Sequence, residues 1–404
     1  MQKIRRLSKD FTNDIKKDDG KRFILPARWL LHFCGFWPDT NSKLFIFYNN
    51  FILANVFIME IFHVYYVLMN IIDIEGVAES AATVTTTLEA LVRTYCMTYK
   101  KEIINDILYK TWKHFWPLNI LPPKKVKEMK NLLYFGCSLT YGFFLMSFVS
   151  TSQITSLSFI RGDGLILKSK FPFNSDKDFI YETVYIWQYF LTWFVQVIVN
   201  AFDFLFIPLV LICACQYLVL QEVLRHLLDP EKSGVHRRKI FGKNWWKLSN
   251  NDVFLECIKQ HHLLISISKK LESSFNLIIL IQFFNSICAI CLSTFVLQFG
   301  KVRGIKMPTY LTAHLLQLFY YCLVGNELTY NSGQLSKGIF ECDWHLVYDL
   351  DFRRALILMM ARSQRNEFLT AGNLTQLNFT SFLMVLRLSF SVNTFLKNFA
   401  STEN

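Results

Sequence analysis

Seven stretches of mostly apolar residues dominate this sequence, and each is long enough to cross a lipid bilayer as a helix. A crossing helix needs about 20 such residues, because lipid offers its backbone groups no hydrogen-bond partner. The stretches cover residues 44–69, 77–99, 132–152, 184–219, 275–299, 309–330 and 376–396. A chain that is 52% hydrophobic and only 18% charged is too apolar for an ordinary soluble domain. The pattern predicts an all-α membrane protein with seven transmembrane helices.

The distribution of Lys and Arg predicts which side of the membrane each connection faces, because positive charge is retained in the cytoplasm. The N-terminal segment and the three connections on its side hold 33 of the 43 Lys and Arg residues, whereas the other side holds 8. This asymmetry predicts a cytosolic N-terminus and, with seven crossings, an extracellular C-terminus. G-protein-coupled receptors have the opposite arrangement.

Two of the predicted spans contain a basic residue. Residues 77–99 include Glu79, Glu89 and Arg93, and the last span includes Arg387. Charged side chains within a bilayer seldom face lipid. We therefore expect these side chains to face protein or water.

Motifs of enzymes, metal sites and nucleic-acid-binding proteins are missing from the sequence. It has no Gly-rich phosphate loop, HExxH, metal-type CxxC pair or nucleophile elbow. The formal charge of +12 is not gathered on one basic helix face. The adjacent His261 and His262 are expected on a solvated face rather than at a metal ion. We predict no catalysis, no cofactor, no bound metal and, with all ten cysteines in spans or cytosolic connections, no external disulfide.

The last predicted span has one mostly polar side. At 100° per residue, Phe382, Leu386 and Phe390 fall largely on the opposite side. The polar side consists of Thr380, Met384, Arg387, Ser391, Thr394, Phe395 and Asn398. Such a stripe needs water or protein partners. It indicates either a water-filled pore or hydrogen bonding between helices.

An ordered series of motifs fills the C-terminal third of the chain. The series is YCLVGNEL at 321–328, DWH at 343–345, RRALILMMARSQ at 353–364 and LRLSFSVNTFLK at 386–397. Together with FPFN at 171–174, it resembles the insect odorant receptors, whose corresponding motifs read YCxxGNEL, DWY, RRALLxMMxRSQ and LKTSYSYFTLLR. Phe390 and Val392 replace both tyrosines of the family's Ser-Tyr-Ser-Tyr, so a gating role of those hydroxyls does not transfer to this chain.

The resemblance implies a subunit of a ligand-gated, poorly selective cation channel in the plasma membrane of olfactory neuron dendrites. The partner that it implies is the odorant receptor co-receptor, in a tetramer. Residues 221–270 form a shorter connection than the co-receptor has, which implies an odorant-tuning subunit. The implied division of the chain is a cytosolic segment (1–43), helices one to six with an outer-half ligand pocket (44–330), a cytosolic anchor region (331–375) and a pore helix with an external tail (376–404).

The resemblance also assigns roles within the last helix, which lines the cation pathway in the family. Phe395 occupies the position of the external hydrophobic constriction, where a ring of apolar side chains can close a pore by dewetting. The other residues assigned to the pore are Thr394, Ser391, Asn398 and Arg387. Because an exposed Arg387 would repel cations, we expect it to pair with an acidic residue, for which Glu327 is the candidate.

In the family, the odorant binds in the outer half of the bundle, between spans two, three, four and six. Helical spacing then selects candidates on one face of each of these spans. The candidates are Thr83, Thr86, Thr87, Phe144, Ser147, Phe148, Thr151, Tyr189, Trp193, Gln196, Tyr310, His314 and Gln317. Ordinary packing is the alternative explanation for each aromatic residue. The mixture of rings and isolated hydroxyls suits a small volatile molecule with one polar group.

Three other classes of membrane protein are alternatives to an odorant receptor. A gustatory receptor would share the topology and the channel mechanism, but its TYxxxxxQF pattern is missing from the last span. A G-protein-coupled receptor would place the C-terminus in the cytosol. A secondary transporter would have paired, broken helices, and Pro208 has no clear counterpart elsewhere in the chain.

Overall fold

Long helices make up most of the computed structural model, which describes residues 21–37, 43–70, 74–161, 164–173, 178–299 and 306–402. The α-helices are α2 (Leu25–Phe33), α3 (Lys43–Met69), α4 (Ile74–Tyr99), α5 (Lys101–His114), α6 (Pro123–Arg161), α7 (Asp178–Arg225), α8 (Pro230–Phe241), α9 (Asn250–Phe299), α10 (Lys306–Gly333), α11 (Leu335–Phe340), α12 (Leu350–Ser363) and α13 (Phe379–Thr402). Short 3-10 helices are η1 (Lys21–Ile24), η2 (Leu118–Ile120), η3 (Gly242–Lys247) and η4 (Trp344–Leu346), and the strands are β1 (Thr370–Ala371) and β2 (Thr375–Gln376).

Helices occupy all seven predicted spans, in the order α3, α4, α6, α7, α9, α10 and α13. Within the described residues, α3, α6, α7 and α9 are long and apolar enough to cross a membrane, and α13 has a shorter apolar part, Phe379–Phe395. The remaining two helices, α4 and α10, bury polar side chains against the rest of the bundle. Their lower hydropathy therefore reflects contact with protein rather than lipid.

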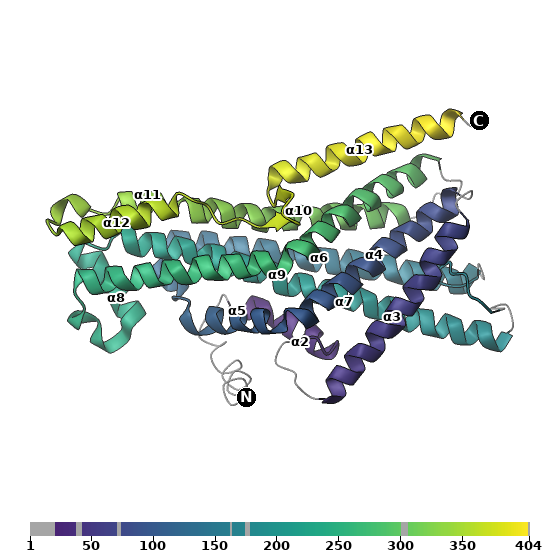
Figure 1. Ribbon diagram of the computed structural model, residues 1–404, viewed down its shortest axis with the longest axis horizontal. Coiled ribbons are helices and arrows are strands. Elements are labelled where there is room, and N and C mark those ends of the chain that lie inside the picture. The colour runs from purple at the N-terminus through teal and green to yellow at the C-terminus, as the bar shows by residue number, and fades with distance from the viewer. Residues whose placement is uncertain are drawn as a thin grey trace.

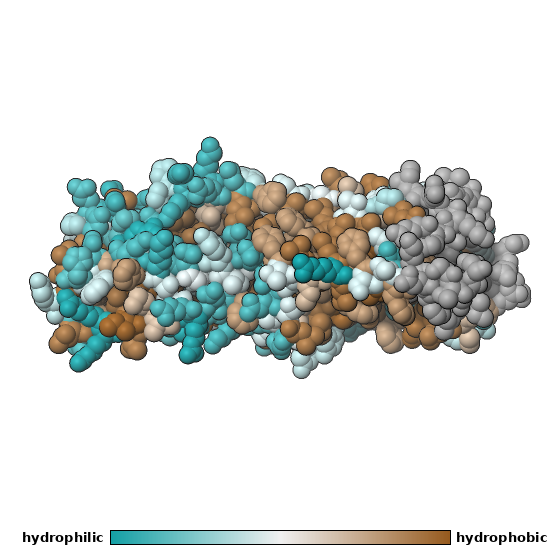
Figure 2. All heavy atoms as spheres, turned by 90° about the horizontal axis from the view of Figure 1, so that it is seen from above, coloured by the Kyte–Doolittle hydropathy of each residue, from teal (hydrophilic) through white to brown (hydrophobic). Residues whose placement is uncertain are grey.

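The bundle is elongated, and its two ends differ. The helices α6, α7, α9 and α10 run along the long axis, whereas α3 and α13 diverge from it on opposite sides (Figure 1). The short helices α11 and α12 lie at the other end. On the face drawn in Figure 2, hydrophilic residues gather at the end of α11 and α12, and hydrophobic residues gather over the middle of the molecule. This division fits a protein that is only partly immersed in a membrane.

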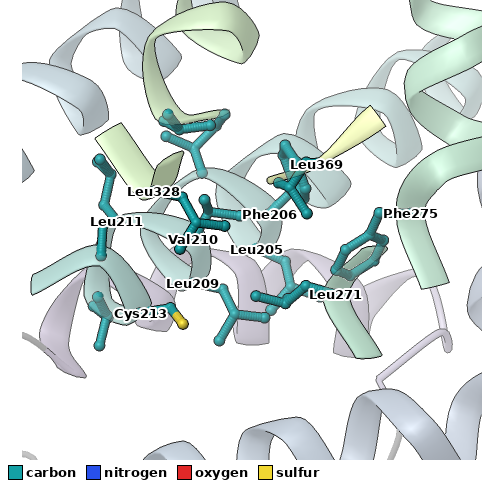
Figure 3. Packing of buried hydrophobic residues seen from close by; sticks show 14 of the residues in the cluster. Leu205, Phe206, Leu209, Val210, Leu211, Cys213, Leu271, Phe275, Leu328 and Leu369 are labelled. Carbon is teal, nitrogen blue, oxygen red and sulfur yellow. The ribbon is translucent and has the colours of Figure 1, made fainter. Parts of the chain in front are cut away.

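The centre of the bundle is formed by α7, whose apolar part is almost entirely buried. Leu205, Phe206 and Leu209 of α7 pack with Phe275 of α9 and Leu328 of α10 (Figure 3). A helix that is apolar on all sides is stable only when other helices surround it. The long predicted span at 184–219 is therefore the core of the fold as well as a spanning segment.

A tight hairpin precedes α13, which begins at Phe379 rather than at residue 376 as predicted. The strands β1 and β2 pair in antiparallel register, and Gly372 and Asn373 between them have positive φ angles of 57° and 61°. Gly and Asn adopt this conformation at the lowest cost among the common residues. The Gly372 amide donates to the Asn276 carbonyl of α9 at 3.0 Å. The hairpin thus fixes the start of α13 against α9.

The predicted anchor region contains α11, α12 and the hairpin. The Asp349 carboxylate caps α12 by accepting from the Asp351 amide at 2.9 Å. Phe352 of α12 contacts Phe254 of α9, with 4.8 Å between ring centroids. Other apolar residues of α12, such as Leu358, are exposed in the single chain.

Candidate ligand pocket and pore helix

A cavity lies between α4, α6, α7 and α10, which correspond to predicted spans two, three, four and six. Its empty space, together with the part that is open to the outside, is about 720 Å³. Met59 reaches it from α3, and Leu167 reaches it from the segment that follows α6. The lining residues are Met59, Thr83, Thr86, Thr87, Glu89, Phe143, Ser147, Ser150, Thr151, Ile154, Leu167, Thr192, Val195, Gln196, Val199, Tyr310, Ala313, His314 and Gln317.

The cavity walls combine apolar side chains with hydroxyl groups, some of which are bonded within their own helices. Thr87 donates to the Thr83 carbonyl at 3.0 Å, and Thr192 donates to the Gln188 carbonyl at 2.8 Å. These hydroxyl hydrogens are used by the backbone, while the oxygen lone pairs remain. Walls of this kind suit an uncharged molecule with a large apolar part.

One end of the cavity is closed by a buried ion cluster. Glu89 lines the cavity and forms an ion pair with Arg93, one turn further along α4. Arg93 Nη1 also lies 2.7 Å from Asp203 Oδ1 of α7. All three side chains are at most 1% exposed. A buried charge without a partner is strongly unfavourable, so this pairing holds α4 and α7 together.

Neutral side chains from two further helices complete the ion cluster. Tyr320 and Tyr321 of α10 donate to the Asp203 carboxylate at 2.5 and 2.7 Å, and Gln317 donates to it at 2.9 Å. Gln282 of α9 accepts from the guanidinium group at 2.8 Å. Because Gln317 also lines the cavity, the cluster connects the cavity to four helices.

Nine of the thirteen candidate ligand-binding residues line this single cavity. They are Thr83, Thr86, Thr87, Ser147, Thr151, Gln196, Tyr310, His314 and Gln317. They come from four helices that are far apart in the sequence, so only the tertiary packing brings them together. Their contact with a ligand stays a prediction.

The other four candidates are aromatic residues that lie outside the cavity lining. Phe144 packs on Phe148, Phe148 on Trp193 and Trp193 on Tyr189, with ring centroids 6.3, 5.0 and 6.4 Å apart. Mutual packing of the rings accounts for their positions. On α6, Phe143 lines the cavity instead of Phe144, whereas Ser147 and Thr151 line it, so the predicted face was rotated by less than one residue, or less than 100°.

Ten lining residues were missed by the sequence analysis. They are Met59, Glu89, Phe143, Ser150, Ile154, Leu167, Thr192, Val195, Val199 and Ala313. Helical spacing could have found several of them, such as Ala313, which lies three residues after Tyr310. No periodic signal marks Leu167, because it lies outside the helices. The Gln188 carboxamide holds it in place by bonding its backbone amide and carbonyl, each at 3.1 Å.

The pore-helix candidates lie on the uncovered side of α13. The helix packs on α9 and α10 through the buried residues Ser381, Val385, Ser389 and Asn393. Arg387, Ser391 and Thr394 are exposed, and Phe395 is 69% exposed. The side chain of Asn398 lies outside the described residues. In the single chain, most of the predicted pore-lining set is therefore free to face water or another subunit.

The ion pair that we expected between Arg387 and Glu327 is not formed. Glu327 instead accepts a hydrogen bond from Asn331 at 3.3 Å. Within the part of the chain that the structure describes, Arg387 has no acidic partner.

Helical architecture, an apolar middle section and an internal cavity define the chain as an all-α membrane protein whose bundle encloses a cavity. Residues 73–390 match the family described as 7tm Odorant receptor. This match covers most of the chain, and the chain belongs to the insect odorant receptor family. The prediction of a receptor rather than an enzyme is thereby confirmed.

Individual relatives and solved structures agree with this assignment. Odorant receptor 19a of Drosophila melanogaster is 28% identical over 150 residues, which are 36% of this chain and 38% of that receptor. Odorant receptor 82a of the same species is 24% identical over 275 residues, or 65% of each chain. The match thus spans little more than a third of the first of these relatives. Both are individual odorant receptors, in agreement with the predicted tuning type.

The olfactory receptor OR5 from Machilis hrabei has a similar fold. It superimposes with a TM-score of 0.76 over 93% of this chain and 96% of that chain, at 14% identity. The structure of the same receptor in complex with eugenol gives the same TM-score and covers 96% of this chain. At this identity, the likeness establishes a common fold.

Proposed function

We propose that this chain is the odorant-binding subunit of a ligand-gated, non-selective cation channel that it forms with the odorant receptor co-receptor. The observation that carries this proposal is the cavity, where nine candidate residues from α4, α6, α7 and α10 converge. The fold is shared with a receptor whose structure includes bound eugenol, which supports a small volatile molecule as the ligand here.

The proposed channel lies in the plasma membrane and has seven crossings per subunit, with the N-terminus inside and the C-terminus outside. Helices at all seven predicted positions and the hydrophilic end at α11 and α12 support this topology (Figure 2). On intact cells, an antibody should label a tag at the C-terminus, and it should label a tag at the N-terminus only after permeabilisation. The reverse pattern would exclude the proposed topology.

The proposed pore is formed where α13 from each of four subunits meets around a central axis. The exposed side of α13 supports this role, because Ser391 and Thr394 can face water and Phe395 can form an apolar constriction. Exposed apolar residues of α12, Ile357 and Leu358, support contact between subunits in the anchor region. A ligand would open the pore only by binding the open state better, with about 1.4 kcal/mol for each tenfold shift.

The proposed function is tested by recording whole-cell current in cells that express this chain with or without the co-receptor. Volatiles from a broad panel are applied while G-protein signalling is blocked. We expect a rapid, non-selective cation current that requires both chains. Absence of current for every volatile, with both chains labelled at the cell surface, would exclude the proposal, as would a current that the block abolishes.

Two variants relate the current to the cavity. Ala313→Ile adds three carbons to a lining residue, and we expect it to raise the half-maximal ligand concentration about tenfold. Phe148→Leu is the matched control, since Phe148 lies outside the lining and is 48% exposed. Phe148→Leu should leave the half-maximal ligand concentration within about twofold of the wild-type value. Equal effects of both variants, at equal surface labelling, would argue against ligand binding in this cavity.

A further inference from the structure

Two polar side chains of the cavity have hydrogen-bonding groups that no other residue in the described part of the chain uses. They differ from Thr87 and Thr192 of the same walls, whose hydroxyl hydrogens are bonded to the backbone. A buried polar group without a partner is uncommon in folded proteins, because its lost contact with water is not replaced. Such groups facing a cavity therefore indicate the chemistry of the molecule that fills it.

Gln196 of α7 presents a free donor. Its carboxamide oxygen already accepts a hydrogen bond from Thr151 of α6 at 3.2 Å. Its Nε2 is buried and has no hydrogen-bond partner among the described residues. This bond from Thr151 orients the carboxamide, so that the oxygen is occupied and the two N–H groups remain available.

His314 of α10 presents a second free group. The residue is 4% exposed, and its Nδ1 has no hydrogen-bond partner within the described chain. The ring is held by an edge-to-face contact with Tyr310, with 4.4 Å between centroids. A neutral imidazole has one N–H donor and one acceptor nitrogen. Since no described residue bonds to Nδ1, this nitrogen can bond to a molecule in the cavity.

We propose that the ligand of this cavity carries a hydrogen-bond-accepting oxygen, as in a ketone, aldehyde or ester, and that Gln196 and His314 donate to it. This inference rests on the proposed function and specifies its ligand class. The apolar part of the molecule contacts Met59, Ile154 and Val195, which line the same cavity. A hydrocarbon of the same shape leaves both donors unpaired and binds more weakly.

The test compares methyl ketones of increasing chain length with the alkenes in which a CH₂ group replaces the carbonyl oxygen. Each pair has nearly the same shape and differs in one acceptor. In cells that express this chain with the co-receptor, the best ketone should act at a concentration at least about tenfold lower than its alkene. Ketones no more potent than their alkenes, with current still evoked, would overturn the inference and leave the proposed function standing. Loss of all current at normal surface labelling would instead remove the proposed function, and this inference with it.

Substitutions test whether Gln196 and His314 cause the preference for ketones over alkenes. Gln196→Met and His314→Phe remove the donors at similar volume, and each should reduce the ketone-to-alkene ratio severalfold by weakening the ketone response alone. His314→Asn retains a donor and should restore part of the ratio. Trp193→Phe is the matched control, because the Trp193 Nε1 is also a buried donor without a partner but lies outside the cavity lining.

The variants also separate recognition from folding. The alkene response and surface labelling report on folding, because an alkene needs neither donor. A ratio that is unchanged in both Gln196→Met and His314→Phe would overturn the inference, as would a ratio that falls equally in Trp193→Phe.

Discussion

Arg93 of α4 and Asp203 of α7 form an ion pair at 2.7 Å, and both side chains are 0% exposed. Glu89 shares the same guanidinium group, so two carboxylates surround one cation. This relationship joins helices that are more than a hundred residues apart in the sequence, directly beside the proposed ligand cavity. The stability of the bundle and the shape of the cavity therefore depend on the same few side chains.

Removing the cation of this cluster should destabilise the protein more than removing one of its carboxylates. Arg93→Met leaves Glu89 and Asp203 buried without a cation, whereas Asp203→Asn leaves the Arg93–Glu89 pair. Breaking a buried pair costs about 3–5 kcal/mol, and we expect this full effect for Arg93→Met and a smaller one for Asp203→Asn. Thermal unfolding of the purified protein in detergent measures both.

An exposed ion pair serves as the control for this comparison. Lys259 and Glu256 are 2.7 Å apart, but their side chains are 61% and 39% exposed. Lys259→Met should change the free energy of unfolding by less than about 1 kcal/mol. The interpretation of the buried cluster fails if Arg93→Met is as mild as this control, or if Asp203→Asn is the more damaging of the two buried substitutions.

The glycine in the YCLVGNEL motif has a structural role that a second substitution can test. A Cβ atom built on Gly325 would overlap the carbonyl oxygen and side chain of Leu377, where the hairpin enters α13. We expect Gly325→Ala to separate α10 from this junction and to cost about 1–3 kcal/mol. Gly142→Ala is the matched control in α6, since its Cβ would lie 3.4 Å from Leu316 in ordinary contact. Equal thermal stability of the two variants would contradict this explanation.

Charge within an apolar segment was a reliable signal for part of the site. Glu89 and Arg93 were expected to face protein, and both are buried in the ion cluster. The same reasoning extended to residues 184–219 would have found Asp203, the single charged residue of that segment. For Arg387, which is exposed in the single chain, the expectation stays a prediction, because the surroundings of that helix face are not supplied by the same chain.

The family resemblance pointed to spans two, three, four and six, and helical spacing then selected only part of the cavity lining on these spans. Spacing identifies which residues share a face, whereas the rotation of each helix in the bundle depends on packing with its neighbours. Phe143 and Phe144 illustrate this limit of helical spacing. The two residues are neighbours in the sequence, yet Phe143 lines the cavity and Phe144 packs on Phe148 outside it. The start of α13 was similarly misplaced because the turn at Gly372 and Asn373 was not considered as a hairpin signal.

The paired histidines of α9 have different environments, which predicts a dependence of stability on pH. Both were expected on a solvated face, but His261 is buried and only His262 is exposed. Burial, with a smaller effect of the Arg362 charge, lowers the pKa of His261 from 6.5 to about 4. The unfolded chain therefore binds a proton that the folded chain does not, and stability falls as the pH decreases from 6.5 towards 4.

At pH 5 this linkage should cost the wild-type protein about 2 kcal/mol relative to pH 7. His261→Phe removes the titrating group and should flatten the decrease in melting temperature between these pH values. His262→Phe should leave the decrease unchanged. Identical pH profiles for the wild type and His261→Phe would show that other groups determine the acid sensitivity.

The uncovered side of α13 can be tested with introduced cysteines, because the native ones give little background. Within the described residues, nine native cysteines are buried and Cys288 is partly exposed. Ser391→Cys and Thr394→Cys place a thiol on the predicted pore side, where water allows the reactive thiolate to form. A cationic, membrane-impermeant thiol reagent applied during ligand activation should block the current of both variants.

Ser389→Cys is the control for this labelling experiment, since Ser389 is 1% exposed and donates to the Val385 carbonyl at 2.8 Å. Its current should persist under the same treatment, as should that of the wild type with its native Cys288. Positions 391 and 394 share one side of the helix, so a pore on that side makes both reactive. If instead Ser389→Cys is blocked and the other two are not, the helix faces the cation pathway with its opposite side, and the assignment of Phe395 to the constriction is wrong.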